Sequence, residues 1–384
     1  MSTSATTPST PSGTPGPGGP GSMAVTDPGR SPAGARLRQN GPGGQGRVLP
    51  DPAPGTPSSS PGSSPDDVVA RGRSTASRLT SLMPVIALVA LVAALTAADP
   101  GFLTERSLVA VVNTAAPLAV LAAGATIVVL CGGIDLSIAA LCSLASVLLA
   151  LWLPDLGGVA ILAVVLAAAA LGALQGLVHV VARIPSFVVT LGGMSVFGAV
   201  ALVVSGAGTV GVSNLDPLRW ATMYVGGRVP VAVLVAVLVV AAIAFTIRLT
   251  PLDSCLKATG YAESAARLAG IHVDAVKVGA FALSGACAGL AAVLLVSRNF
   301  SGSPTMADSL LLPAVAAIVV GGTAITGGHG GVWRTLAGAL VVTLLRVGLS
   351  TVGVSSAYEQ ILYGAVIVAA VALTLDRSKV LTIK

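Results

Sequence analysis

The sequence predicts an all-α integral membrane protein with about ten transmembrane helices and a disordered N-terminal tail. Of its 384 residues, 54% are hydrophobic and only 9% are charged, whereas a soluble globular protein carries about 25% charged residues. Aromatic residues make up 3%, so the apolar side chains are mainly Ala, Val and Leu, which pack helices closely in lipid. These apolar residues also fall in runs close to the roughly 20 residues that cross a bilayer as a helix.

The first 76 residues form the predicted tail. Residues 1–76 are rich in Pro, Gly, Ser and Thr and hold almost no clustered apolar side chains, so they cannot bury enough surface to offset the entropy lost on ordering. No apolar core long enough for a cleavable signal peptide begins before Leu82. We therefore predict a disordered cytoplasmic tail over 1–76 and a polytopic transmembrane domain over 77–384.

Ten apolar runs follow the tail, and each is a predicted span. The eighth is short and bounded by glycine, so it is either continuous or re-entrant. Irregular backbone within a membrane is tolerated only where protein or a water-filled cavity covers it. The ten runs are 82–98, 108–130, 136–153, 159–182, 187–204, 229–247, 278–296, 310–321, 336–352 and 357–375.

Basic residues between the runs predict the topology. With ten crossings and a cytoplasmic N-terminus, twelve basic residues face the cytoplasm and four face outward, which is the bias of the positive-inside rule. Both termini are therefore predicted to be cytoplasmic. The twelve are Arg71, Arg73, Arg78, Arg183, Arg248, Lys257, Arg267, Lys277, Arg334, Arg377, Lys379 and Lys384, and the four are Arg106, Arg219, Arg228 and Arg298.

Several chemistries lack support in the sequence. There is no GxxxxGK[ST] motif, so we do not expect the chain to hydrolyse ATP unaided, and there is no HExxH motif or nucleophile elbow. The four cysteines and three histidines are too dispersed to argue for a metal site or a disulfide framework. The basic residues do not gather with interleaved aromatics, as nucleic-acid binding requires. We expect no cofactor, no metal and no nucleic-acid partner.

The longest polar stretch, 248–277, is predicted to contain a short helix. Glu263 and Arg267 are spaced i, i+4 in the favourable order. Ala265 and Ala266 are small enough for another surface to approach closely, and Gly270 is a natural helix C-terminus. A solvated connector with helical propensity is the alternative interpretation.

This stretch resembles the EAA-type coupling loop of ABC-importer permeases of the ribose, xylose and galactose group. Three further segments resemble the same family in the same order: 132–137, 184–192, and 321–328 with 353–356, so that the resemblance covers about 82–375. The chain departs from the family pattern at Tyr261-Ala262, at Ile138-Ala139-Ala140, at His329, and at Leu311-Leu312-Pro313, where two acidic residues are usual. In the loop itself, the matching residues are Ala265, Ala266, Arg267, Gly270 and Ile271.

The resemblance implies the permease subunit of an importer for a monosaccharide or a similar small polar solute, in the cell membrane. It implies a cytoplasmic ABC ATPase that supplies hydrolysis, an extracytoplasmic solute-binding protein and a second permease copy, as a homodimer surrounded by membrane lipid. The ATPase-coupling residues would be Glu263, Ala265, Ala266, Arg267 and Gly270. An ion-driven secondary transporter is the alternative, although few acidic residues lie within the predicted spans.

Two ionisable residues near or within the spans have open roles. Asp135 follows a Gly pair and precedes an apolar run, which is the placement of an N-cap whose carboxylate accepts from free amides of the first helical turn. The alternative is a charge that lines the solute path. For Arg346, within the ninth run, we favour an internal carboxylate partner or snorkelling over contact with solute.

We predict that deleting residues 1–71 leaves membrane insertion and transport intact, because the deleted segment lacks apolar side chains with which to pack. Membrane levels and solute uptake of the truncated chain would be compared with those of the full chain. Loss of assembly on truncation would contradict the predicted role of 1–76 as a tail.

Overall fold

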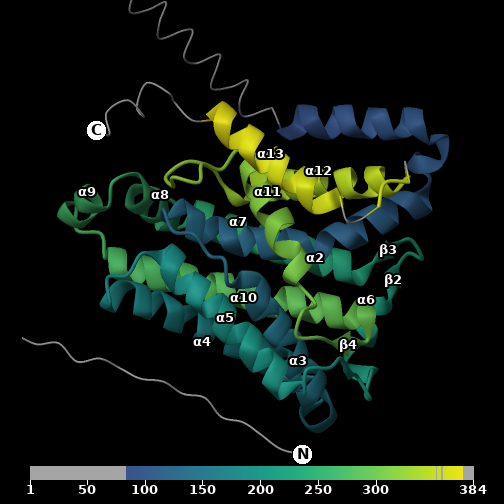
Figure 1. Cartoon of the computed structure of the whole chain (residues 1–384), viewed down its shortest axis with the longest axis horizontal. Helices are drawn as coiled ribbons and strands as arrows, with labels where there is room; N and C mark the ends of the chain where they lie inside the picture. Colours follow the sequence, from purple (N-terminus) through teal and green to yellow (C-terminus); the bar gives the residue numbers. More distant parts are fainter. Residues whose placement is uncertain (1–83, 352, 356–357, 375–384) are drawn as a thin grey trace, which may run out of the picture. The chain divides into compact units, whose positions relative to one another are not determined.

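The computed structural model describes residues 84–351, 353–355 and 358–374. The predicted tail over 1–76 lies outside the described residues. Helices make up most of the described chain (Figure 1). They are Pro84–Ala98, η1 (Pro100–Leu103), α2 (Glu105–Leu130), α3 (Ile138–Leu156), α4 (Val159–Val181), α5 (Ser186–Val204), η2 (Asp216–Leu218), α6 (Arg219–Thr222), α7 (Val231–Leu249), α8 (Leu252–Tyr261), α9 (Glu263–Leu268), α10 (Val273–Asn299), η3 (Asp308–Leu310), α11 (Leu311–Val320), α12 (Val332–Thr351) and α13 (Glu359–Thr374).

Each of the ten predicted runs coincides with a helix in the described residues. Seven helices, namely α2, α3, α4, α5, α7, α10 and α12, are long and apolar enough to cross a membrane, and three are shorter apolar helices. The predicted all-α, multi-spanning class is confirmed, and the count of ten is approximate. The shortest run forms a continuous ten-residue helix, α11.

The described strands form two short antiparallel pairings outside the helices. β1 (Val210–Gly211) pairs with β4 (Ser301–Gly302), in the register Val210 to Gly302. β2 (Tyr224–Val225) pairs with β3 (Val229–Pro230). Each strand has two residues, so these pairings fix the ends of loops and leave the all-α class unchanged.

The core forms around α2 and α10, which pack against each other, and α10 also packs along α4 and α3. Small residues allow this close packing. A Cβ atom at Gly285 of α10 would overlap the carbonyl oxygen of Ala168, and one at Gly172 of α4 would overlap that of Phe281. Gly124 of α2 likewise lies against α10. Backbones that approach this closely gain van der Waals contact, which drives helix association where lipid is the solvent.

α11 and α12 pack together on the other side of α2, and α11 also contacts α13 (Figure 1). Arg346 of α12 lies 3.1 Å from a carboxylate oxygen of Glu359 on α13. The internal carboxylate partner predicted for Arg346 is therefore confirmed. Thr126 of α2 and Thr335 of α12 share a buried hydroxyl hydrogen bond of 2.8 Å, which satisfies two polar groups inside the apolar bundle.

The outer helices leave apolar faces uncovered by this chain. Only 17% of the most apolar 18-residue stretch of α5 is buried inside this chain, compared with 72% of the corresponding stretch of α3. Large exposed apolar side chains lie along α4, α5 and α7, among them Leu162, Leu166, Val188, Val203 and Leu238. Apolar surface on this scale is not stable in water, so it marks faces for lipid or for another membrane chain.

We predict that Gly285→Ala destabilises the bundle by about 1–3 kcal/mol, because the added methyl group forces α10 away from α4. Gly279→Ala on the same helix is the matched control, since nothing lies within 4 Å of a Cβ atom at Gly279. There the change should be neutral or stabilising by up to ~1 kcal/mol, as expected for Gly to Ala in a helix. Thermal unfolding of both variants in detergent measures the difference. Equal melting temperatures would contradict the role of Gly285 in close packing.

Candidate functional site

The predicted coupling helix exists as α9, and Gly270 ends it. Gly270 has φ +84°, a left-handed conformation that glycine adopts without steric cost. The amide of Ile271 donates to the carbonyl of Ala266 at 3.0 Å, and the amide of Gly270 donates to that of Arg267 at 3.1 Å. These two bonds form a Schellman motif. The chain therefore turns sharply from α9 into α10.

Ion pairs fasten α9 to the start of α10. Glu263 accepts from Arg267 at 3.0 Å, which is the i, i+4 pair predicted from the sequence. Glu263 also accepts from Lys277 of α10 at 2.7 Å, and Arg267 pairs with Asp274. The hydrogen bond from Lys277, with that from Arg267, holds the pKa of the Glu263 carboxyl below its ordinary value. Glu263 therefore stays charged at neutral pH, and α9 and α10 are linked by two cations and two carboxylates.

The two alanines of α9 differ in their surroundings. Ala265 is exposed, but Ala266 is only 4% exposed and packs inside this chain. The expectation that both alanines present a surface to another protein is corrected for Ala266, because adjacent residues of a helix point about 100° apart and Ala266 points into this chain. Leu268, which the sequence analysis did not select, is instead 91% exposed. The signal in the sequence was a large apolar side chain directly after Arg267, in a short helix that holds no other large apolar residue.

Glycines from two loops and from the end of α8 meet beside α9. We call Gly132, Gly260, Gly327 and Gly328 the glycine junction. A Cβ atom at Gly260 would overlap the carbonyl oxygen of Leu130, and one at Gly327 would lie 2.7 Å from the Cα atom of Gly132. The amide of Gly328 donates to the carbonyl of Leu130 at 3.1 Å. The α2–α3 loop, the end of α8 and the α11–α12 loop are thus in backbone contact, which any larger residue would separate.

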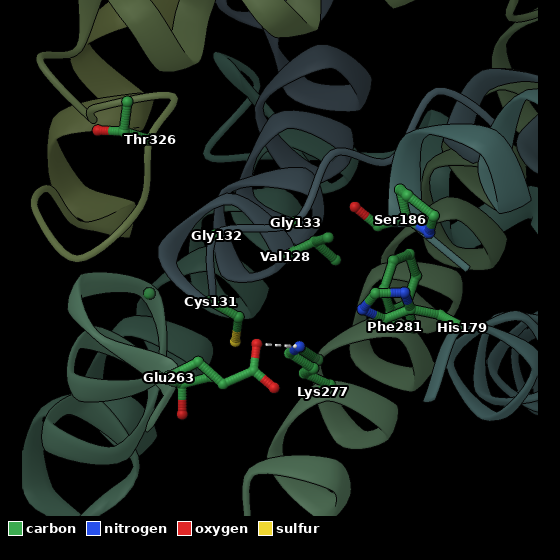
Figure 2. A pocket seen from close by; sticks show the side chains of 14 residues that line it. Val128, Cys131, Gly132, Gly133, His179, Ser186, Glu263, Lys277, Phe281 and Thr326 are labelled. Atoms are coloured by element: carbon green, nitrogen blue, oxygen red, sulfur yellow. Dashed lines mark hydrogen bonds and ion pairs between the residues drawn. The ribbon is translucent and has the colours of Figure 1, made fainter. Parts of the chain in front are cut away.

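A cavity of about 340 Å³ opens between α9 and the α2–α3 loop. Figure 2 shows Glu263, Lys277 and Cys131 on one side of the cavity, and Ser186, His179 and Phe281 on another. Burial raises the pKa of the Cys131 thiol to about 12, so the thiol stays protonated at neutral pH and is not an active nucleophile. The cavity therefore lies between α9, α10 and the α2–α3 loop, and its cysteine is not activated.

The carboxylate of Asp135 is buried between three helices. Its Oδ1 accepts from the amide of Ser137 at 3.0 Å and from the Ser137 hydroxyl at 2.7 Å. The hydrogen bond from the Ser137 amide is the capping interaction predicted for Asp135. However, α3 begins at Ile138, and its N-cap is Ser137. The predicted N-cap position is therefore wrong: Asp135 lies two residues before the N-cap and accepts from the Ser137 amide from there. Its Oδ2 accepts from the hydroxyl of Ser284 on α10 at 2.8 Å, a bond that the sequence did not predict.

Gln175 of α4 completes this buried polar network. The Ser137 hydroxyl lies 2.8 Å from the Gln175 amide, and a Cβ atom at Gly193 of α5 would overlap that amide. A hydroxyl donates only one hydrogen, so the consistent arrangement has the Gln175 NH₂ group donating to Ser137, which donates to Asp135. Gln175 was not among the predicted site residues. Its signal was a lone amide side chain inside an apolar run, where polar groups need partners.

Basic residues separate to two ends of the bundle in the described residues. Arg183, Arg267 and Lys277 line one cavity at the α9 end, and Arg248, Lys257 and Arg334 line another there. Arg228 instead pairs with Glu105 at 3.4 Å, at the opposite end of α2 and α7. Two groups of basic residues at opposite ends are expected if successive helices cross the membrane in alternating directions.

We predict that Asp135→Asn retains membrane insertion, because the Asn oxygen still accepts from Ser137 and its NH₂ group can donate to Ser284. Asp135→Leu leaves the Ser137 amide and both hydroxyls without this acceptor, at about 1–3 kcal/mol for each group left unsatisfied. Melting temperatures and uptake would be measured, with Asp155→Leu at the exposed end of α3 as control. Normal stability with complete loss of uptake in the Asn variant would instead favour a role for the charge in the solute path.

Known proteins resemble this chain over most of its length. The ribose import permease protein of Escherichia coli (strain K12) is 34% identical over 296 residues, which cover 75% of this chain and 91% of that protein. The ribose import permease protein of Bacillus subtilis (strain 168) is 35% identical over 310 residues, 78% and 94% of the two chains. The D-allose transport system permease protein of Escherichia coli (strain K12) is 29% identical over 277 residues, 71% and 84%. No solved structure matches the chain significantly.

A family model described as the permease component of the branched-chain amino acid transport system matches residues 107–371. The matched region runs from α2 into α13 and contains α9, the glycine junction and the Asp135 network. It also covers most of the region in which the sequence resembles ABC-importer permeases. The prediction of a transport permease is confirmed, and this chain belongs to that family of membrane-spanning permease components.

Proposed function

We propose that this chain is the permease subunit of an ABC importer that carries a monosaccharide, such as ribose, xylose or galactose, across the cell membrane. The relatives named for ribose and D-allose transport support this solute class. The family description names branched-chain amino acids, so leucine is the competing solute. The alignments with the relatives named for sugars cover most of this chain and most of each relative. A sugar is therefore the favoured solute.

The proposed assembly has three further components. A cytoplasmic ABC ATPase hydrolyses ATP, an extracytoplasmic solute-binding protein delivers the solute, and a second permease copy forms a homodimer within the lipid. The exposed apolar faces of α4, α5 and α7 support contact with lipid or with that second copy. The basic residues at the α9 end support placing that end in the cytoplasm. With an even number of crossings, both termini would then be cytoplasmic.

One observation carries the coupling role: α9 is joined to α10 by the Glu263–Lys277 ion pair, and α10 is at the centre of the core. A displacement of α9 is therefore transmitted to α10, which packs against α2, α3 and α4. The exposed side chains of Ala265 and Leu268 form the contact surface for the ATPase. Ala266 and Gly270 keep α9 in shape, from inside the chain and at its C-terminus.

An ion-driven secondary transporter is the second candidate. Such a protein needs acidic groups free to take up and release a cation within the bundle. Two carboxylates there are instead held by protein groups: Asp135 by Ser137 and Ser284, and Glu359 by Arg346. The relatives named as import permeases, and not these two carboxylates alone, favour the ATP-driven mechanism.

We predict that vesicles holding the chain with its co-purifying ATPase and binding protein take up ribose when ATP is supplied, and that a protonophore leaves the uptake unchanged. Leucine uptake under the same conditions is the comparison. Uptake abolished by the protonophore and independent of ATP would overturn the importer in favour of an ion-driven transporter. ATP-driven uptake of leucine alone would overturn the sugar assignment.

We predict that Leu268→Asp reduces recovery of the ATPase at least about 10-fold on co-purification, because it places a charge in an apolar contact. Leu215→Asp, at an exposed leucine far from α9, is the matched control. Glu263→Lys should also weaken docking, since it breaks the bond to Lys277 and detaches α9. The double variant Glu263→Lys and Lys277→Glu exchanges the two charges and keeps the ion pair. It should restore docking if the pair serves to hold α9.

Wild-type ATPase recovery and solute-stimulated hydrolysis in Leu268→Asp and Glu263→Lys would remove α9 as the coupling surface. Failure of the charge exchange to restore docking would show instead that Glu263 meets a basic group of the ATPase directly. Ala266→Trp should disrupt α9 itself, because that side chain is buried within this chain.

A further inference from the structure

The crossing that contains α11 is only partly helical. α11 has ten residues, which rise about 15 Å, whereas the hydrocarbon core of a bilayer is about 30 Å thick. The C-terminal end of α11 leads into the loop that carries Gly327 and Gly328 of the glycine junction, at the α9 end. The N-terminal end of α11 therefore lies near the middle of the membrane. The segment 300–310, before α11, forms the other half of the crossing.

Contacts with α3 independently place this segment at the same depth. The amide of Ala307 donates to the Ser143 hydroxyl at 2.9 Å, and the amide of Ser303 donates to the Ser146 hydroxyl at 3.2 Å. Ser146 lies ten residues before the last residue of α3, or roughly 15 Å along the helix. A segment with no α-helix, which ends in the short 3-10 helix η3, thus runs beside the middle of a membrane-crossing helix and is anchored there by two serines.

The exposed side chains of residues 305–309 are polar. Thr305, Asp308 and Ser309 are exposed in this chain, and Asp308 accepts from the Ser143 hydroxyl at 3.3 Å through Oδ1, which leaves Oδ2 free to accept other bonds. Irregular backbone and a carboxylate cannot face lipid at this depth, because their polar groups would lack partners. Since this chain does not cover them, they face either water or polar groups of a second copy of the chain, and the reactivity of a cysteine placed there separates the two.

We propose that residues 305–309 line the solute path and that Asp308 accepts hydrogen bonds from the hydroxyl groups of a polyhydroxylated neutral solute. This proposal rests on the proposed importer function and specifies a solute contact within it. A carboxylate accepts strongly from hydroxyl donors.

Accessibility tests the water-filled path without requiring transport. Ser309→Cys and Leu166→Cys would each be made in a chain whose four native cysteines are replaced, and treated in permeabilised vesicles with a charged methanethiosulfonate reagent. Position 309 should react and position 166, on the outward apolar face of α4, should not. Ribose should slow the reaction at position 309. If the Ser309→Cys variant is as unreactive as the Leu166→Cys variant, the proposal is overturned.

Uptake kinetics test the role of Asp308. Asp308→Asn keeps an acceptor for Ser143 but loses the charge, and should raise the KM for ribose at least about 10-fold, as expected for loss of a charged hydrogen bond. Asp155→Asn is the matched control and should leave KM unchanged. An unchanged KM in Asp308→Asn, with active wild type, would overturn the solute contact alone. No ATP-driven uptake by the wild type would instead count against the importer function, while the cysteine reaction still reports on the path.

Discussion

The close approach of α10 to α4 and α2 is the constraint on which the other arrangements depend. Glycines at 172 and 285 allow these helices to meet at backbone distance, and in lipid such contact replaces the hydrophobic driving force of a water-soluble core. Once α10 is fixed, Ser284 reaches Asp135 and Lys277 reaches Glu263. These two residues of α10 are seven positions apart, about two helical turns, so one side of α10 carries both contacts.

Two polar connections with different exposure therefore share a single helix. The Glu263 connection is an exposed ion-pair network that holds a six-residue helix, and ion pairs of this kind are individually weak. The Asp135 connection is buried and satisfied by hydroxyl groups, where each bond counts for more. The outer element is therefore held more weakly than the inner network. The glycine junction leaves the two loops and the end of α8 little freedom to move separately.

The irregular segment before α11 follows the same physical rule as the helices. A backbone inside a membrane must satisfy its polar groups, and helices do this by themselves. The segment 300–310 satisfies its polar groups partly through backbone amides that donate to the hydroxyls of Ser143 and Ser146 on α3. The arrangement gives up helical regularity at one place and exposes polar side chains there, which an uninterrupted apolar helix could not present.

The sequence by itself determined the class, the placement of the apolar helices, the Glu263–Arg267 pair and the end of α9 at Gly270, because hydrophobic runs, i, i+4 spacing and glycine turns are local properties. It also predicted partners for Asp135 and Arg346, because a charge in an apolar setting needs one. Only the tertiary structure decided which partners these were: Ser284 and Glu359 lie on distant segments. The burial of Ala266, the meeting of four glycines and the depth of Asp308 likewise depend on how helices pack, which no local pattern encodes.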